Sequence, residues 1–175
     1  MTHTWADFVS AEPRFAETVR RRFEQYTHHV LATLRKDGSP RVTGLEVFFR
    51  SGELWLGMMP NSRKAQDLLR DPRFAVHTNP GGGGDRGDGN GDGIAADGDV
   101  RVGGRAVEVS DESVIARFVA EVRPPLPFHL FRVELTEVVQ TRVEGEDLVV
   151  RVWRPGRPLR TVRRGNDDSA PREDG

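Results

Sequence analysis

Ser62, Arg63 and Lys64 form the short stretch whose residue types and spacing best suit a chemical role. A segment typical of a strand precedes them and an amphipathic segment typical of a helix follows, so they stand at a helix N-terminus. The first turn of a helix leaves backbone N–H groups unpaired and carries positive dipole charge. A hydroxyl, a guanidinium and an ammonium group at that point would build a phosphate-binding site. The same pattern also fits a solvated helix end, and the residues alone leave both interpretations open.

A second candidate is the stretch GGGGDRGDGNGDGIAADGD at residues 81–99. Its oxygen-bearing residues match the start and the twelfth position of an EF-hand calcium loop at Asp88, Asn90, Asp92, Gly93 and Asp99. An EF-hand loop lies between two helices, whereas a strand pattern follows this stretch. No Gly-Lys-Ser/Thr follows the glycines, which excludes a P-loop for nucleotide phosphates. We therefore interpret the stretch as a solvated insertion that lengthens a turn, and a calcium-binding module is the least favoured hypothesis.

The elements that must position these stretches are mostly short strands. Apolar residues recur at helical spacing after Pro13, and three strands separated by the turn sequences KDGSP and RSGE occupy about residues 29–59. A short helix, two strands, a second helix and two long strands follow, at about residues 62–71, 73–78, 100–110, 111–122, 130–144 and 148–153. This order predicts a mainly β fold, a six- to seven-stranded antiparallel barrel with two or three peripheral helices. A doubly wound parallel sheet would need a helix after nearly every strand.

The predicted organisation is one domain over residues 1–164, with the insertion at about residues 80–99. Residues 165–175 are polar, and we expect them to form a disordered tail.

Composition excludes several function classes. The formal net charge of −1 gives no electrostatic reason to expect nucleic acid or an acidic membrane as a partner. The absence of cysteine excludes disulfides, thiolate zinc sites and a cysteine nucleophile. The N-terminus lacks a signal-peptide pattern and no apolar run reaches bilayer length, so we expect a soluble cytoplasmic protein. His28 and His29 would point to opposite faces of a strand, and no metal site is expected.

Residues 28–78 resemble the pyridoxamine 5′-phosphate oxidase-like proteins, which adopt the FMN-binding split β-barrel. The likeness lies in the Asp-Gly-x-Pro hairpin, the strands after it, and Ser-Arg-Lys opening a helix that RDPR closes. The sequence VRVGGRAVEVSDE continues it after the insertion. The resemblance implies a homodimer with a flavin at each of two equivalent sites in the subunit interface.

The resemblance also implies which residues bind the cofactor. Arg41 would join Ser62, Arg63 and Lys64 at the cofactor phosphate. The backbone at two further strands would line the isoalloxazine ring, at Val42, Thr43, Gly44, Gly57 and Met58.

Three departures from the family pattern bear on the substrate. Glu46 occupies the position of a lysine that helps bind the substrate phosphate in true pyridoxamine phosphate oxidases, and Asp99 replaces a flavin-contacting glutamine. The C-terminal Arg-x-His substrate motif has no counterpart, since the last histidine is His129. We therefore expect an oxidoreductase that depends on FMN, or alternatively on the 8-hydroxy-5-deazaflavin coenzyme, and acts on another small organic substrate. The alternative is a non-catalytic flavin carrier or sensor, and no catalytic residue stands out.

Overall fold

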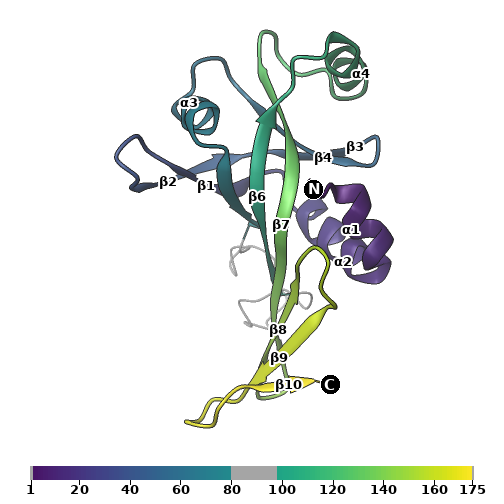
Figure 1. Ribbon diagram of the computed structural model, residues 1–175, viewed down its shortest axis with the longest axis vertical. Coiled ribbons are helices and arrows are strands. Elements are labelled where there is room, and N and C mark those ends of the chain that lie inside the picture. The colour runs from purple at the N-terminus through teal and green to yellow at the C-terminus, as the bar shows by residue number, and fades with distance from the viewer. Residues whose placement is uncertain (1, 80–97, 175) are drawn as a thin grey trace, which may run out of the picture.

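The computed structural model describes residues 2–79 and 98–174. The residues between these ranges include most of the calcium-like motif, which therefore lies outside the described residues. Within the described ranges the chain forms four helices and ten strands (Figure 1).

Two helices begin the chain, α1 (Trp5–Ala11) and α2 (Pro13–Glu24). Thr4 and Asp7 cap α1 reciprocally through a capping box, and Pro13 occupies the first turn of α2, where its missing N–H costs no helical hydrogen bond. The apolar face of α2 packs into the core, as the helical spacing predicts. Helix α1 was not predicted from the sequence.

The sequence predicts three strands in this region, whereas the structure has four: β1 (His29–Leu34), β2 (Pro40–Leu45), β3 (Val47–Arg50) and β4 (Glu53–Met58). The predicted second strand is broken at Glu46, so β1 pairs with β2 and β3 pairs with β4 as two hairpins. Ser51 and Gly52 both adopt positive φ, at 51° and 74°. This is the conformation that a two-residue turn with primed geometry requires, so the RSGE sequence closes the β3–β4 hairpin.

The remaining elements follow the predicted order and then extend it. They are α3 (Arg63–Arg70), β5 (Arg73–His77), β6 (Asp99–Glu108), α4 (Glu112–Val122), β7 (His129–Glu144), β8 (Asp147–Trp153), β9 (Arg160–Arg164) and β10 (Arg172–Asp174). Strands β9 and β10 were not predicted. Residues 172–174 pair with β9, whereas the sequence predicts a disordered tail after Arg164. The carboxylates of Glu173 and Asp174 pair with Arg160 and Arg163 of β9, which gives this polar segment ion-pair partners.

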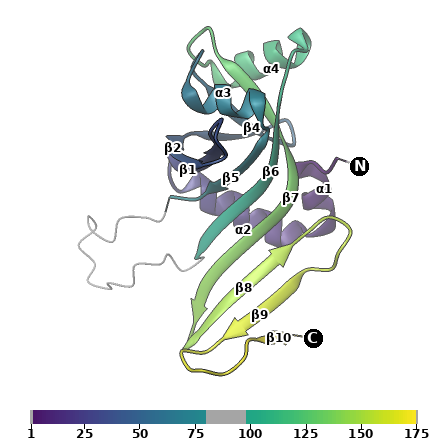
Figure 2. The same cartoon turned by 60° about the vertical axis from the view of Figure 1, so that its left-hand side comes forward.

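The strands form one antiparallel sheet in the order β10-β9-β8-β7-β6-β5-β1-β2, and β4 pairs with both β3 and β7. The first half of β7 therefore lies between β4 and β6, and its second half lies between β6 and β8. Figures 1 and 2 show this second half running away from the barrel together with β8–β10. We call residues 138–174 the C-terminal arm. The mainly β antiparallel split barrel is confirmed.

The pairing of β6 with β7 shifts its register between Gly103 and Gly104. A Cβ atom at Gly104 would lie 2.0 Å from the backbone oxygen of Glu134, so only glycine fits there.

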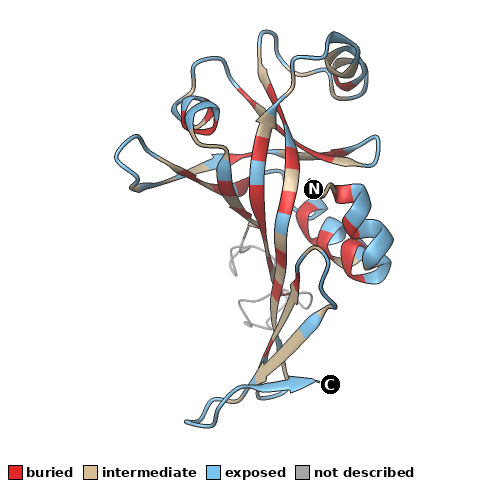
Figure 3. Cartoon of the chain, viewed as in Figure 1, coloured by how far each residue is buried: buried red, intermediate tan, exposed pale blue. Residues whose placement is uncertain are grey.

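The core fills the barrel and continues beneath α1 and α2 (Figure 3). Arg22 of α2 is fully buried at the edge of this core. Its guanidinium donates to the backbone oxygens of Asn79 and Gly98, each at 2.7 Å. One side chain thus holds the two described residues that flank residues 80–97.

His29 lies beside this arginine and is also buried. Its Nδ1 accepts a hydrogen bond from the backbone N–H of Asn79 at 3.2 Å. Burial, together with the neighbouring Arg22 guanidinium, lowers the pKa of His29 to about 4, so the ring is neutral at neutral pH.

Candidate functional site

The N-terminus of α3 has the geometry that its sequence predicts. Ser62 is the N-cap with extended backbone angles, and its Oγ accepts a hydrogen bond from the Ala65 N–H at 3.4 Å. The first turn of α3 contains no acidic residue, which leaves the positive helix end without a neighbouring carboxylate in that turn. Ala65 and Leu68 pack into the core and fix the helix against the barrel.

Lys64 joins α3 to β2. Its Nζ donates to the backbone oxygen of Gly44 at 2.5 Å. The side chain is half-buried, and this burial lowers the pKa of the ammonium group. A cation that has lost part of its hydration favours the approach of an anion.

Asp67 anchors the remaining charged groups near this helix end. Its carboxylate is 3% exposed and accepts from Thr33 Oγ1 at 2.9 Å, Arg41 Nε at 2.6 Å and Arg70 Nη2 at 3.1 Å. Burial raises the pKa of Asp67, but the three hydrogen bonds outweigh it and the net pKa is lowered. The carboxylate therefore stays ionised and ties β1, β2 and α3 together, holding Arg41 at the base of the helix.

Five of the nine predicted site residues do not line the same space as Lys64. Ser62 caps α3 and Arg41 pairs with Asp67, and the other three lie elsewhere. Arg63 is exposed, and the side chain of Val42 is 66% exposed on the outer side of β2. Thr43 pairs with the core residue Leu31, and its hydroxyl oxygen is buried and forms no hydrogen bond among the described residues.

A cavity of about 440 Å³ lies beside the N-terminus of α3. It contains four of the nine predicted site residues, namely Gly44, Gly57, Met58 and Lys64. The structure thus brings together the β2 and β4 positions and the lysine, although they lie up to twenty residues apart in sequence. The volume falls in the range typical of small-molecule sites, roughly 300–1,000 Å³.

A further wall of the cavity is formed by α4, β3 and the segment after α4, which were not predicted to belong to the site. Phe118 of α4 packs against Phe48 of β3, with ring centroids 5.5 Å apart, and against Phe128, at 5.9 Å. Both partner rings line the cavity, together with Pro124, Pro125 and Pro127 of the segment after α4. These residues give the cavity an apolar wall.

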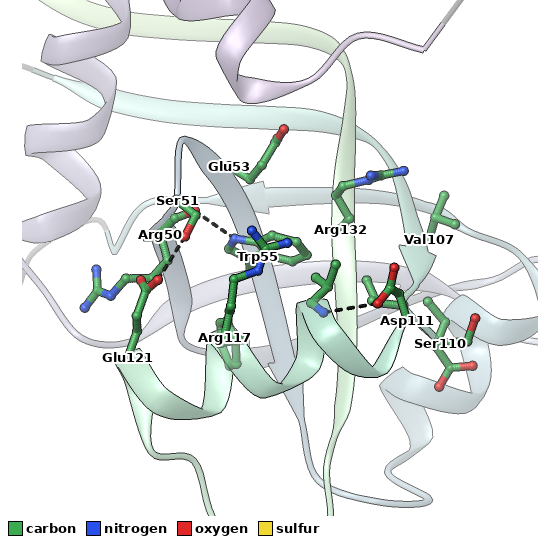
Figure 4. A pocket seen from close by; sticks show the side chains of 14 residues that line it. Arg50, Ser51, Glu53, Trp55, Val107, Ser110, Asp111, Arg117, Glu121 and Arg132 are labelled. Atoms are coloured by element: carbon green, nitrogen blue, oxygen red, sulfur yellow. Dashed lines mark hydrogen bonds between the residues drawn. The ribbon is translucent and has the colours of Figure 1, made fainter.

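Figure 4 shows how the other side of α4 is held, around a separate cavity of about 370 Å³. Asp111 caps the helix through the N–H groups of Ser113 and Val114, and Glu121 accepts a hydrogen bond from Ser51 at 2.9 Å. The indole of Trp55 forms part of this second cavity and contacts Phe118, so the same phenylalanine separates the two spaces. The second cavity contains none of the predicted cofactor residues, and its contacts fix α4 as a wall.

Histidine and carboxylate side chains do not gather into a metal site within residues 2–79 and 98–174. In the same ranges, every helix is too short or too polar to cross a membrane. The Nδ1 of His77 lies 2.7 Å from the backbone oxygen of Thr78, which fits the role of a hydrogen-bonded strand residue.

The fold and the site define the class of protein, an antiparallel split β-barrel with a basic helix N-terminus beside an apolar cavity. The family model described as pyridoxamine 5′-phosphate oxidase matches residues 6–142, more than half of the chain. The chain belongs to this family.

Solved structures show the same fold. A pyridoxamine 5′-phosphate oxidase-related, FMN binding protein from Nostoc punctiforme is 14% identical and has a TM-score of 0.56, over 88% of this chain and 96% of that chain. A NimC/NimA family protein from Clostridium acetobutylicum is 13% identical, with a TM-score of 0.52, over 89% and 94%. Campylobacter jejuni ChuZ is 13% identical with a TM-score of 0.57, and the match covers 81% of this chain and 60% of ChuZ. The curated proteins contain no match.

Proposed function

We propose that the protein binds a flavin, FMN in the first instance, and acts as an oxidoreductase on a small organic substrate. The observation that carries this proposal is the apolar cavity that opens beside the half-buried ammonium group of Lys64. Membership of the family and the FMN-binding description of the Nostoc punctiforme protein support the choice of cofactor. The 8-hydroxy-5-deazaflavin coenzyme, which also joins a ring system to a phosphate, is the alternative.

The residues present fit such a cofactor. The first-turn amides of α3 have no helical acceptor, and Lys64 belongs to the same turn, so these groups would hold the phosphate. Arg41, which pairs with Asp67 of the same helix, would add a further cation. Gly44 and Gly57 line the cavity from β2 and β4. With no side chain of their own, they would let the ring lie against the strands.

The bound cofactor would supply hydride transfer. The chain's own residues would bind, orient and shield it. Asp67 keeps Arg41 in place, α3 presents its amides, and the aromatic wall around Phe118 excludes water from the ring.

We also propose that the active form is a homodimer. Several large apolar side chains near the cavity are exposed, among them Val42, Met59 and Leu126 at 66%, 74% and 70%. Val30 lies on the same outer side of the sheet as Val42 and is 37% exposed. An exposed apolar group of this kind marks a contact surface, and a second copy would cover it and close the cofactor site.

The second candidate function is a non-catalytic flavin carrier or sensor. It is favoured by the few ionisable groups in the cavity, where Lys64 is accompanied only by His28 and Glu46 among the described residues. Reduction and reoxidation assays of the loaded protein separate the two functions, because a carrier would show no turnover with any organic acceptor.

Purified protein provides the direct test of cofactor binding. We expect a flavin absorbance spectrum, and mass spectrometry of the molecule released on denaturation distinguishes FMN from the deazaflavin. Lys64→Ala should weaken FMN binding by about 1.5–3 kcal/mol, the contribution of one charged hydrogen bond. The matched control is Lys36→Ala, which removes an exposed lysine from the β1–β2 turn. An unchanged dissociation constant in Lys64→Ala and in the double variant Arg63→Ala/Lys64→Ala would contradict the assignment.

A further inference from the structure

The charges that line the candidate cavity suggest which substrates it accepts, provided that the proposed function is correct. Of the fourteen residues that line it, three carry ionisable side chains, His28, Glu46 and Lys64. Lys64 lies at the α3 end, where its ammonium contacts the Gly44 oxygen and where the proposed cofactor phosphate would bind. Among the described residues of one chain, His28 and Glu46 therefore set the charge that is left for a substrate.

Glu46 follows the last residue of β2, at the break before β3. Its carboxylate oxygen lies 3.6 Å from the His28 Nε2, and both side chains stay accessible at the rim, with 46% and 73% of their surface exposed. The contact is long and solvated, so the histidine screens the carboxylate only weakly. Glu46 thus presents negative charge to any molecule entering the cavity.

Among the residues that the structure describes, the inner surface offers no compensating cation. Apart from two glycines, the rest of the lining is apolar. These side chains come from β2–β4, the residue after β4, α4 and the proline-rich segment after α4, at Leu45, Phe48, Met58, Met59, Phe118, Pro124, Pro125, Pro127 and Phe128. Burying a phosphate or carboxylate against such a surface costs its hydration without return. A flat apolar ring, by contrast, gains contact with Phe48 and Phe128.

We propose that this cavity accepts neutral or cationic aromatic molecules and rejects those that carry a phosphate or carboxylate, with Glu46 as the specificity-determining residue. A site that accepts a phosphate needs a basic residue facing the substrate, whereas here the carboxylate of Glu46 faces it. The substrate class therefore differs from the phosphorylated substrate in the family's name.

Isothermal titration of the FMN-saturated protein with three matched probes tests this proposal. Benzyl alcohol, benzylamine and benzyl phosphate share one ring and carry zero, positive and negative charge. We expect the alcohol and the amine to bind at least about tenfold more tightly than the phosphate. Glu46→Gln should remove the advantage of the amine over the alcohol, and Glu46→Lys should make the phosphate the best ligand. The control Glu146→Gln removes an exposed carboxylate from the C-terminal arm and should change none of the three affinities.

The outcomes separate the inference from the proposed function. If FMN binds but benzyl phosphate binds as tightly as benzyl alcohol, or if none of the probes binds, only the substrate class is overturned. The same holds if Glu46→Lys leaves the order of the probes unchanged while FMN affinity is retained. If FMN itself does not bind, the proposed function fails, and the substrate assignment fails with it because Lys64 would then be open to the substrate.

Discussion

Around α3 a single buried carboxylate accepts hydrogen bonds from three donors, whereas the C-terminal arm carries several carboxylates that each meet an arginine at the surface. Asp67 is 3% exposed and joins three elements of the barrel. In the arm, Glu173 of β10 pairs with Arg160 of the neighbouring strand β9, and Asp147 of β8 pairs with Arg172 of β10, with most of these side chains in contact with water. Both regions are rich in arginine–carboxylate contacts, but only those of the C-terminal arm are largely exposed to water.

This difference determines what each contact contributes. Water already stabilises the charges of the arm, so forming the pairs adds little to the free energy of folding. Asp67 has exchanged water for a fixed set of donors, and removing it leaves Arg41 next to a buried void. The count of ion pairs is therefore a poor guide to stability here, and the burial of each pair is a better one.

The largest effect is expected for Asp67→Ala. Loss of one partner from a buried ion pair typically costs about 3–5 kcal/mol, and we expect the free energy of unfolding to fall by that amount. Urea denaturation followed by circular dichroism measures it. Asp71→Ala removes a more accessible carboxylate, with 27% of its side chain exposed, just after the same helix and should have a smaller effect. Equal losses in the two variants would contradict the contrast between buried and exposed pairs.

The buried His29 should make stability depend on pH. Its pKa is about 4 in the folded protein and 6.5 in a free side chain, so the unfolded chain binds the extra proton between these values. The contribution is fully present above about pH 6.5 and is lost as the pH falls toward 4, by up to about 3 kcal/mol. Denaturation of wild type and His29→Gln at about pH 7.5 and pH 4.5 should give a shallower pH dependence for the variant. His28→Gln, at an exposed position, should keep the wild-type slope.

A milder change at Asp67 separates folding from binding. Asp67→Asn keeps the shape of the side chain but weakens its hold on the Arg41 guanidinium. We expect FMN affinity to fall by roughly tenfold, which corresponds to about 1.4 kcal/mol, in fluorescence titrations. Asp71→Asn is the matched control. A variant that loses stability without any change in FMN affinity would restrict Asp67 to a structural role.

The smallest effect is expected in the arm. Glu173→Gln removes an exposed partner of Arg160, and its denaturation midpoint should be indistinguishable from that of wild type. A clear loss of stability in this variant, at low and at high salt alike, would show that the arm depends on its ion pairs.

Local chemistry explains which features the sequence could predict. The Ser62 cap, the RSGE turn and the helical face of α2 depend on neighbouring residues alone, and all three are confirmed. The capping box of Thr4 and Asp7 was also readable in the sequence, so α1 could have been predicted.

The cavity walls could not be found in the same way. Phe48 and Phe118 lie seventy residues apart, and no periodicity indicates that their rings meet. The role of Asp67 could not be predicted for the same reason, since two of its three hydrogen-bond donors come from strands distant in sequence, β1 and β2. One indication of this role was present in the sequence, since Asp67 lies between the basic residues Lys64 and Arg70 on one predicted helix.

Arg22 makes the two ends of the β5–β6 connection neighbours whatever lies between them. Because its guanidinium bonds to the oxygens of Asn79 and Gly98, we expect the pairing of β5 with β6 to tolerate changes in the length of the intervening chain. The β5–β6 connection is therefore a suitable insertion site for protein engineering. A short linker, an epitope or a reporter domain could replace residues 81–97 while the barrel keeps its register.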